Sequence, residues 1–200
     1  MELIESMRDS FCVDDRYDHF KYVLQQVKIG GLFLEFGVRD GDSINYIANI
    51  ISPHIIYGFD SFEGLPETWE RKRDGSLNYE AGTFSVEKIP EVRANVVLIK
   101  GWFSDTLPIF NEIEKIAFIN IDSDLYSSAR TILTVLNEQI VNGSILYFDE
   151  ITGWGNLHEQ YDNWQNGEYK ALKEWLKDYG REVEPVSRNN RYGAAVRVIR

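Results

Sequence analysis

Cysteine is almost absent from this chain, which has Cys12 alone among 200 residues. A single cysteine excludes a framework of disulfides within the chain and is typical of a reducing compartment, so we expect a cytoplasmic protein. Long apolar runs are missing too, since no segment approaches the roughly 20 apolar residues of a bilayer-spanning helix. Met1 to Ser10 also carries acidic residues where a secretory signal would be basic and then apolar. We therefore expect no membrane partner.

Positive charge is scarce. The 21 Lys and Arg residues face 32 Asp and Glu residues, which gives a net charge of −11. Such a chain repels phosphate backbones, so we expect no nucleic acid partner. One local basic run, Arg71-Lys72-Arg73, is either an anion contact or, as is commoner for adjacent charges, a solvated loop.

Repeats and low-complexity tracts are absent as well, which excludes a repeat array. With 44% apolar and 14% aromatic residues, the chain has ample material for a core. We expect one domain over residues 1–200, with an N-terminal helical segment at 1–30.

Apolar runs of strand length alternate with helical patterns along most of the chain. A helical pattern at 129–140, for instance, is expected to end at Asn142-Gly143. Two last strands flank Asn189-Asn190 and predict a closing hairpin. The expected fold is a three-layer α/β/α Rossmann-like sandwich with a seven-stranded, mostly parallel sheet and an antiparallel C-terminal strand. The seven strands are expected at 32–36, 55–59, 96–100, 117–121, 144–148, 183–186 and 194–199.

Residues 64–95 have little periodicity and contain several Gly and Pro residues among charges. A stretch this long without secondary structure is usually an active-site lid or a disordered insertion. We favour the lid.

Four strand ends switch abruptly from apolar residues to Gly, Asp, Glu and Ser. The ends of parallel strands meet at one edge of a sheet, where such folds bind ligands. The first of these strings, LEFGVRDGDS at 34–43, contains only Gly37 and Gly41. The dinucleotide fingerprint requires three glycines, so a nicotinamide-dependent dehydrogenase is the weakest interpretation.

Asp60 ends the second strand and lies 19 residues after Gly41. That position suits a carboxylate that accepts hydrogen bonds from two ribose hydroxyls, although Asp60 could instead cap its own turn. At the next strand end, Trp102 and Phe103 present flat apolar rings suited to a purine, or equally to packing in the core.

Four carboxylates end the fourth and fifth strands: Asp122, Asp124, Asp149 and Glu150. Gathered on one rim they would repel one another unless a cation compensates them, one of them is protonated or some of them point to water. Hard oxygen ligands of this kind suit Mg²⁺ or Ca²⁺. Alternatively, Asp124 caps the following helix and Glu150 is solvated. His158 could serve as a base, although a surface loop histidine is the commoner case.

Three strings are long and unusual: YGFDSFEGLP at 57–66, GWFSDTLP at 101–108 and NIDSDLYSS at 120–128. With the first strand end and LYFDEI at 146–151, they resemble the macrocin O-methyltransferase family, within the class I S-adenosylmethionine-dependent methyltransferases. The resemblance covers most of the chain. It implies a methyltransferase that acts on a hydroxyl of a small molecule, such as a sugar or a natural-product glycoside.

The resemblance also implies roles for individual residues. The methionine end of S-adenosylmethionine would lie on Glu35, Gly37 and Ser43, the ribose on Asp60, and the adenine near Ser61, Phe62, Trp102 and Phe103. Asp124 would be the general base. A divalent metal, expected to be Mg²⁺, would lie between Asp122, Asp149 and Glu150, and here the chain departs from the family, which has Asp-Asp where this sequence has Asp149-Glu150.

Two other functions stay open: a hydroxylase-like member of the same fold, and a non-catalytic subunit that binds S-adenosylmethionine beside an active partner. A homo-oligomer is a further possibility, because the aromatic residues Trp154, Tyr161 and Trp164 are expected to be exposed and could cover either a partner or the acceptor pocket.

Overall fold

The computed structural model describes residues 3–71, 78–110, 113–151 and 163–200. Eight strands form one sheet in the order β1-β7-β8-β6-β5-β2-β3-β4. Five of them are parallel neighbours that follow the apolar runs of the sequence: β2 (Leu32–Phe36), β3 (Ile56–Asp60), β4 (Val96–Lys100), β5 (Ile116–Ile121) and β6 (Ile140–Phe148). The chain reverses its direction of travel across the sheet between β2 and β5, the switch point at which such sheets bind ligands.

The C-terminal hairpin has the expected antiparallel strand. β8 (Ala194–Val198) pairs antiparallel with both β6 and β7 (Val183–Asn189). A short eighth strand, β1 (Phe11–Val13), adds parallel to β7 and was missed, because three residues are too few to show a period.

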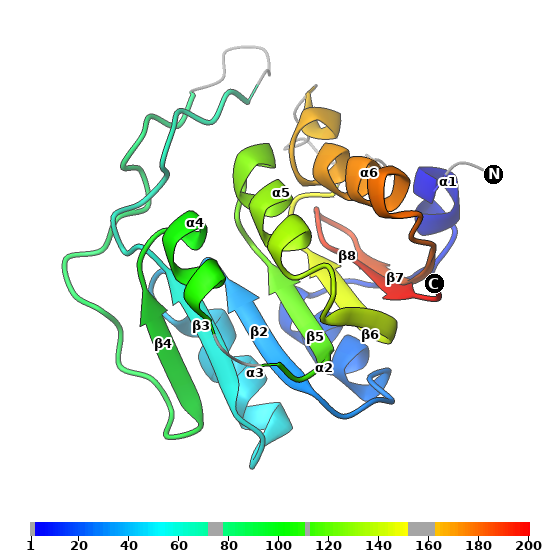
Figure 1. Ribbon diagram of the computed structural model, residues 1–200, viewed down its shortest axis with the longest axis horizontal. Coiled ribbons are helices and arrows are strands. Elements are labelled where there is room, and N and C mark those ends of the chain that lie inside the picture. Colours follow the sequence, from blue (N-terminus) through cyan, green and yellow to red (C-terminus); the bar gives the residue numbers. More distant parts are fainter. Residues whose placement is uncertain (1–2, 72–77, 111–112, 152–162) are drawn as a thin grey trace.

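Helices cover both faces of the sheet (Figure 1). One face carries α2 (Arg16–Gln25) and α3 (Asp42–Ile51), which pack on Phe33, Phe118 and Tyr147. The other carries α1 (Leu3–Arg8), α4 (Phe103–Thr106), α5 (Tyr126–Val135) and α6 (Glu168–Tyr179), which pack on alternate residues of the same strands. Short 3-10 turns lie at Leu107–Ile109 and Trp164–Asn166. The expected three-layer sandwich is confirmed.

The expected end of the helix before β6 was wrong. α5 ends at Val135, and Ile140 already pairs with Ile116 on β5. Gly143 has a φ of +95° inside β6, where the pairing with β5 shifts, so Asn142-Gly143 forms a bulge rather than a helix end. A glycine marks both features in a sequence, which is why the two were confused.

The structure describes two segments of the expected lid, residues 64–71 and 78–95. Its two limbs run antiparallel, with a bridge between Trp69 and Tyr79 and a hydrogen bond from the Leu65 N–H to the Thr83 carbonyl at 2.9 Å. They project from the end of β3, beyond the carboxyl edge of the sheet (Figure 1).

Trp164 is only 6% exposed and lies against Tyr169, so the expectation of an exposed ring at 164 was wrong. The other two aromatics of that expectation, Trp154 and Tyr161, and His158 lie outside the described residues. In the parts of the chain that the structure describes, no helix is long and apolar enough to cross a membrane.

Candidate active site

A cavity of about 480 Å³ opens at the carboxyl edge of the sheet, beside the switch point between β2 and β5. Loops after β2, β3, β4, β5 and β6 all contribute to its wall, as does the described part of the lid. The residues lining it include Arg16, Gly37, Arg39, Asp60, Ser61, Leu65, Phe84, Trp102, Phe103, Asp122, Asp124, Ser127 and Asp149.

Asp60 joins two of the loops in this wall. One carboxylate oxygen accepts a hydrogen bond from the backbone N–H of Arg39 at 2.7 Å, and the other accepts one from the N–H of Phe62 at 2.6 Å. Asp60 therefore does cap its own turn, as the alternative interpretation held. Each carboxylate oxygen can accept more than one hydrogen bond, so the same side chain also offers acceptors to a ligand in the cavity.

The other residues expected around the adenine divide into two groups. Ser61, Trp102 and Phe103 line the cavity. Phe103 also packs edge-on against Phe36 with ring centres 5.3 Å apart, so it serves both the cavity and the core. Phe62 is 6% exposed and packs in the core on the α2 and α3 face, outside the group of described residues that line the cavity.

Glu35 and Ser43 lie behind the cavity wall. The Ser43 hydroxyl donates to one oxygen of Glu35 at 2.8 Å, and the Asn120 amide donates to the other at 3.1 Å. Glu35 is fully buried, and burial raises its pKa to about 8 against the effect of these two hydrogen bonds. The three side chains join β2, β5 and α3, and so support the first strand end from beneath.

The raised pKa of Glu35 should make the free energy of unfolding depend on pH. With its folded pKa raised from 4.5 to about 8, the folded chain holds a proton that the unfolded chain releases, so the free energy of unfolding falls as pH rises through that window. Glu35→Gln cannot titrate and removes this contribution. Between pH 5.5 and 7.5 in urea titrations, we expect wild type to lose about 1 to 3 kcal/mol relative to the variant, given the limit of ~1.4 kcal/mol per pH unit. The exposed Glu87→Gln is the matched control; equal pH profiles for wild type and Glu35→Gln would refute the assignment.

Gly37 is required by the close approach of two strand ends. It has a φ of +90°, and a Cβ at this position would lie 1.8 Å from the Asp122 carbonyl oxygen. The carbonyl belongs to the backbone and cannot move aside easily. Gly37 therefore brings the loop after β2 against the loop after β5.

Gly37→Ala is expected to destabilise the chain by more than about 3 kcal/mol in urea titrations. Gly82 is a matched control, because its φ of +84° is similar while its nearest Cβ neighbour would lie 4.0 Å away. Gly82→Ala should cost only the conformational strain, about 1 to 2 kcal/mol. Equal losses in the two variants would show that backbone conformation alone, and not the contact with Asp122, makes the glycine necessary.

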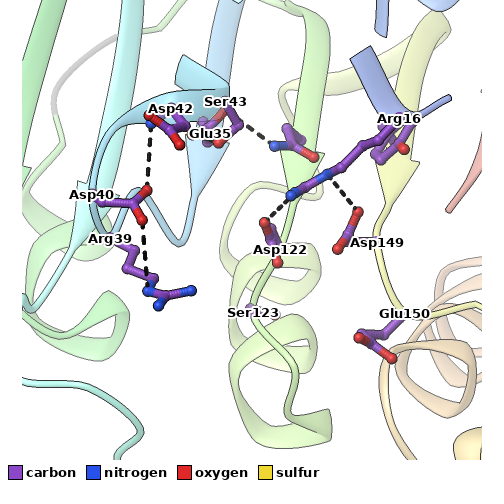
Figure 2. A network of polar contacts seen from close by, with 12 residues as sticks. Arg16, Glu35, Arg39, Asp40, Asp42, Ser43, Asp122, Ser123, Asp149 and Glu150 are labelled. Carbon is purple, nitrogen blue, oxygen red and sulfur yellow. Dashed lines mark hydrogen bonds and ion pairs between the residues drawn. The ribbon is translucent and has the colours of Figure 1, made fainter. Parts of the chain in front are cut away.

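Asp122 and Asp149 meet at the base of the cavity, and a guanidinium lies between them. Arg16, the first residue of α2, contacts Asp122 through Nη2 at 2.5 Å and Asp149 through Nε at 3.1 Å (Figure 2). Burial alone lowers the pKa of Arg16, but the charges of Asp149 and Asp122 outweigh it and raise that pKa above its ordinary value. Burial, and then repulsion from Asp149, raise the pKa of Asp122 to about 7.

Glu150 is directed away from this pair (Figure 2). It is 7% exposed, and its backbone N–H donates to Glu168 at 3.1 Å. The other oxygen of Glu168 accepts from the backbone N–H of Ser123 at 3.0 Å. Burial, and then the nearby Asp124 charge, hold the pKa of Glu150 well above its usual range. Glu168 thus ties together the ends of β5 and β6.

Asp124 follows in the same loop and faces the cavity. Its φ of +59° is left-handed, a conformation that aspartate and asparagine tolerate better than most residues. Burial, and then the charges of Asp122 and Asp149, raise its pKa to about 8. A carboxyl group whose pKa lies near neutral pH is a suitable proton acceptor in catalysis.

The three expected metal ligands do not converge. Asp122 and Asp149 lie together, but Arg16 forms an ion pair with each of them and Glu150 faces elsewhere. Among the described residues, no group of three acidic, histidine or cysteine side chains is arranged to hold a metal ion. As arranged, these side chains fit a guanidinium and not a divalent cation.

Three residues of this region escaped the sequence reasoning: Arg16, Glu168 and Asn120. Asn120 left a signal, because it is a lone polar residue in an apolar strand and pairs in register with Glu35. Arg16 and Glu168 left none, since each begins an ordinary amphipathic helix and reaches the site only through the fold.

Comparison with known proteins agrees with this architecture. The family model described as macrocin O-methyltransferase matches residues 7–177. The chain belongs to this family. A curated relative from Streptomyces olivaceus, 8-demethyl-8-(2,3-dimethoxy-alpha-L-rhamnosyl)-tetracenomycin-C 4'-O-methyltransferase, is 29% identical over 68% of this chain and 59% of its own length. Demethyldecarbamoylnovobiocin O-methyltransferase from Streptomyces niveus is 28% identical over 61% of this chain and 53% of its own.

This chain therefore spans between half and three fifths of the length of the curated relatives that it matches. Among solved structures, the calicheamicin methyltransferase CalS11 superposes with a TM-score of 0.68 at 24% identity, covering 90% of this chain and 77% of that one. At this identity the likeness shows the fold alone, a three-layer α/β/α sandwich that the two proteins share.

Proposed function

We propose that this chain transfers the methyl group of S-adenosylmethionine to a hydroxyl of a small molecule, a sugar or a natural-product glycoside. One observation carries the proposal: a single cavity at the switch point is lined by Asp60 and Trp102 and also by Asp124. The first two suit an adenosine, and the third suits the acceptor hydroxyl. Family membership supports the reaction, and the rhamnosyl specificity in the name of the Streptomyces olivaceus relative supports the acceptor class.

The cofactor residues act from two layers. In the cavity wall, Asp60 would accept hydrogen bonds from the ribose hydroxyls while Trp102 and Phe103 flank the adenine. Gly37 lines the cavity and would lie against the methionine end. Behind the wall, Glu35 and Ser43 hold the strand end in place.

The chemistry needs little more than alignment and a base. A lone pair of the acceptor oxygen forms the new O–C bond, the S–C bond breaks with its electrons remaining on sulfur, and the hydroxyl proton passes to Asp124. Leu65 and Phe84 extend the cavity wall from the lid, and Arg39 lies over the Phe84 ring at 5.2 Å. The lid would thereby exclude water during transfer.

The resemblance to the family also predicts a Mg²⁺ ion between Asp122, Asp149 and Glu150. A bound Mg²⁺ would lower the pKa of the acceptor hydroxyl, but Arg16 already binds both Asp122 and Asp149. Four further points stay predictions from the sequence: a single domain over 1–200, a cytoplasmic location, the absence of nucleic acid and membrane partners, and self-association.

Purified chain incubated with S-adenosylmethionine carrying a labelled methyl group tests the proposal. We expect the label on the oxygen of a rhamnosylated or related glycoside, detected by mass spectrometry, with release of S-adenosylhomocysteine. Product made by the chain alone would eliminate the partner-subunit interpretation. Iron-dependent oxygen consumption without label transfer would instead favour the hydroxylase.

A further inference from the structure

Arg16 is an unusual component for the base of this cavity. It comes from the N-terminal part of the chain and joins two aspartates that directly follow different strands, Asp122 after β5 and Asp149 after β6. About a third of its side chain is exposed, and the guanidinium lines the cavity. It occupies the space between the two carboxylates that a bridging cation would need.

The helix that carries Arg16 is held firmly in place. The Asp15 carboxylate caps α2 by accepting hydrogen bonds from the N–H groups of Tyr17 and Asp18. One turn later, His19 and Phe20 are fully buried, and the guanidinium lies 5.4 Å from the centre of the Phe20 ring. Moving Arg16 out of the site would break both ion pairs and this cation–π contact.

Charge balance argues in the same direction. With both carboxylates ionised, Asp122, Asp149 and Arg16 together carry a net charge of −1, opposite to the single positive charge of a sulfonium. A divalent cation added to Arg16 would leave the group at +1 beside that sulfonium, an arrangement that like-charge repulsion disfavours.

We infer that Arg16 is the resident cation of this active site, a positioning residue that replaces a divalent metal between Asp122 and Asp149 and makes methyl transfer independent of added metal. The inference rests on the proposed function for the nature of the reaction. Its structural part, a carboxylate pair closed to metal by Arg16, does not depend on the substrate.

Binding of Mn²⁺ followed by electron paramagnetic resonance tests the structural part without any turnover. Wild type should leave the free Mn²⁺ signal unchanged, and Arg16→Met should bind one Mn²⁺ per chain at least ~10-fold more tightly than wild type, because it leaves two carboxylates uncompensated. Arg16→Lys keeps the charge and should resemble wild type. In the double variant Arg16→Met with Asp149→Asn, the gain should disappear.

Chelation tests the catalytic part. Wild-type turnover should be the same with excess EDTA as with added Mg²⁺. Tight Mn²⁺ binding by wild type, or loss of turnover on chelation that Mg²⁺ restores, would overturn the inference even if Arg16→Met fails to fold. A wild-type chain that binds no Mn²⁺ but makes no methylated product under either condition would refute the proposed function and leave the closed carboxylate pair standing.

Discussion

Asp60→Ala is expected to weaken S-adenosylmethionine binding by about 150- to 25,000-fold in calorimetry. The carboxylate would accept hydrogen bonds from two ribose hydroxyls, and bonds to a charged acceptor contribute roughly 1.5 to 3 kcal/mol each. The same change also removes the hydrogen bonds from the N–H groups of Arg39 and Phe62, so the loop that contains Gly37 loses support as well.

Asp40→Ala provides the control for this loss. Asp40 lies in the same loop, its side chain is 57% exposed, and its contact with Arg39 is long at 3.9 Å. Asp40→Ala removes the same charge from the same region without changing the cavity wall. The affinity for S-adenosylmethionine should therefore change by less than about threefold. Unaltered affinity in Asp60→Ala, or equal losses in both variants, would contradict the ribose assignment.

Asp124→Asn should reduce kcat by about 100- to 10,000-fold while the affinity for S-adenosylmethionine stays within about threefold of wild type. The range is that of a lost general base. Asparagine has the same shape as aspartate and tolerates the left-handed backbone at this position, so the loop should keep its conformation. Single-turnover rates with saturating cofactor give the measurement.

Asp105→Asn is the matched control, since Asp105 is exposed on α4 and lies outside the cavity wall. It should retain wild-type kcat. If Asp124→Asn retains more than about a third of wild-type turnover, Asp124 is not the base, and the proton must leave through another group.

Much of the fold could be predicted because each parallel strand ends in an abrupt change of residue type. The bounds expected for β2 and β4 agree with the structure, and those of β3 and β5 differ by one residue. Errors fell where one residue type serves two purposes. Gly143 was expected to end a helix and instead forms a bulge, whereas Gly180, with a φ of +61°, does end the helix α6.

The site was harder to predict than the fold. Residues at the end of a strand, such as Asp60, or directly after it, such as Asp122, reach the cavity because topology alone puts them there. A step of one residue then decides the outcome, since Glu150 turns away while Asp149 faces Arg16. No local pattern encodes that difference.

Contacts between distant segments were beyond reach altogether. Arg16 lies 106 residues before Asp122, and only the packing of α2 on the sheet brings the two together. Glu168, which binds the loops after β5 and β6, is similarly remote from Ser123 in sequence.

A crystal structure of the chain with S-adenosylhomocysteine is the most direct test of the central claim. The account predicts that the ribose hydroxyls bind Asp60, that the adenine lies beside Trp102, and that the sulfur faces the part of the cavity lined by Asp124. An adenosine bound elsewhere on the molecule, or in this cavity with its sulfur directed away from Asp124, would contradict it.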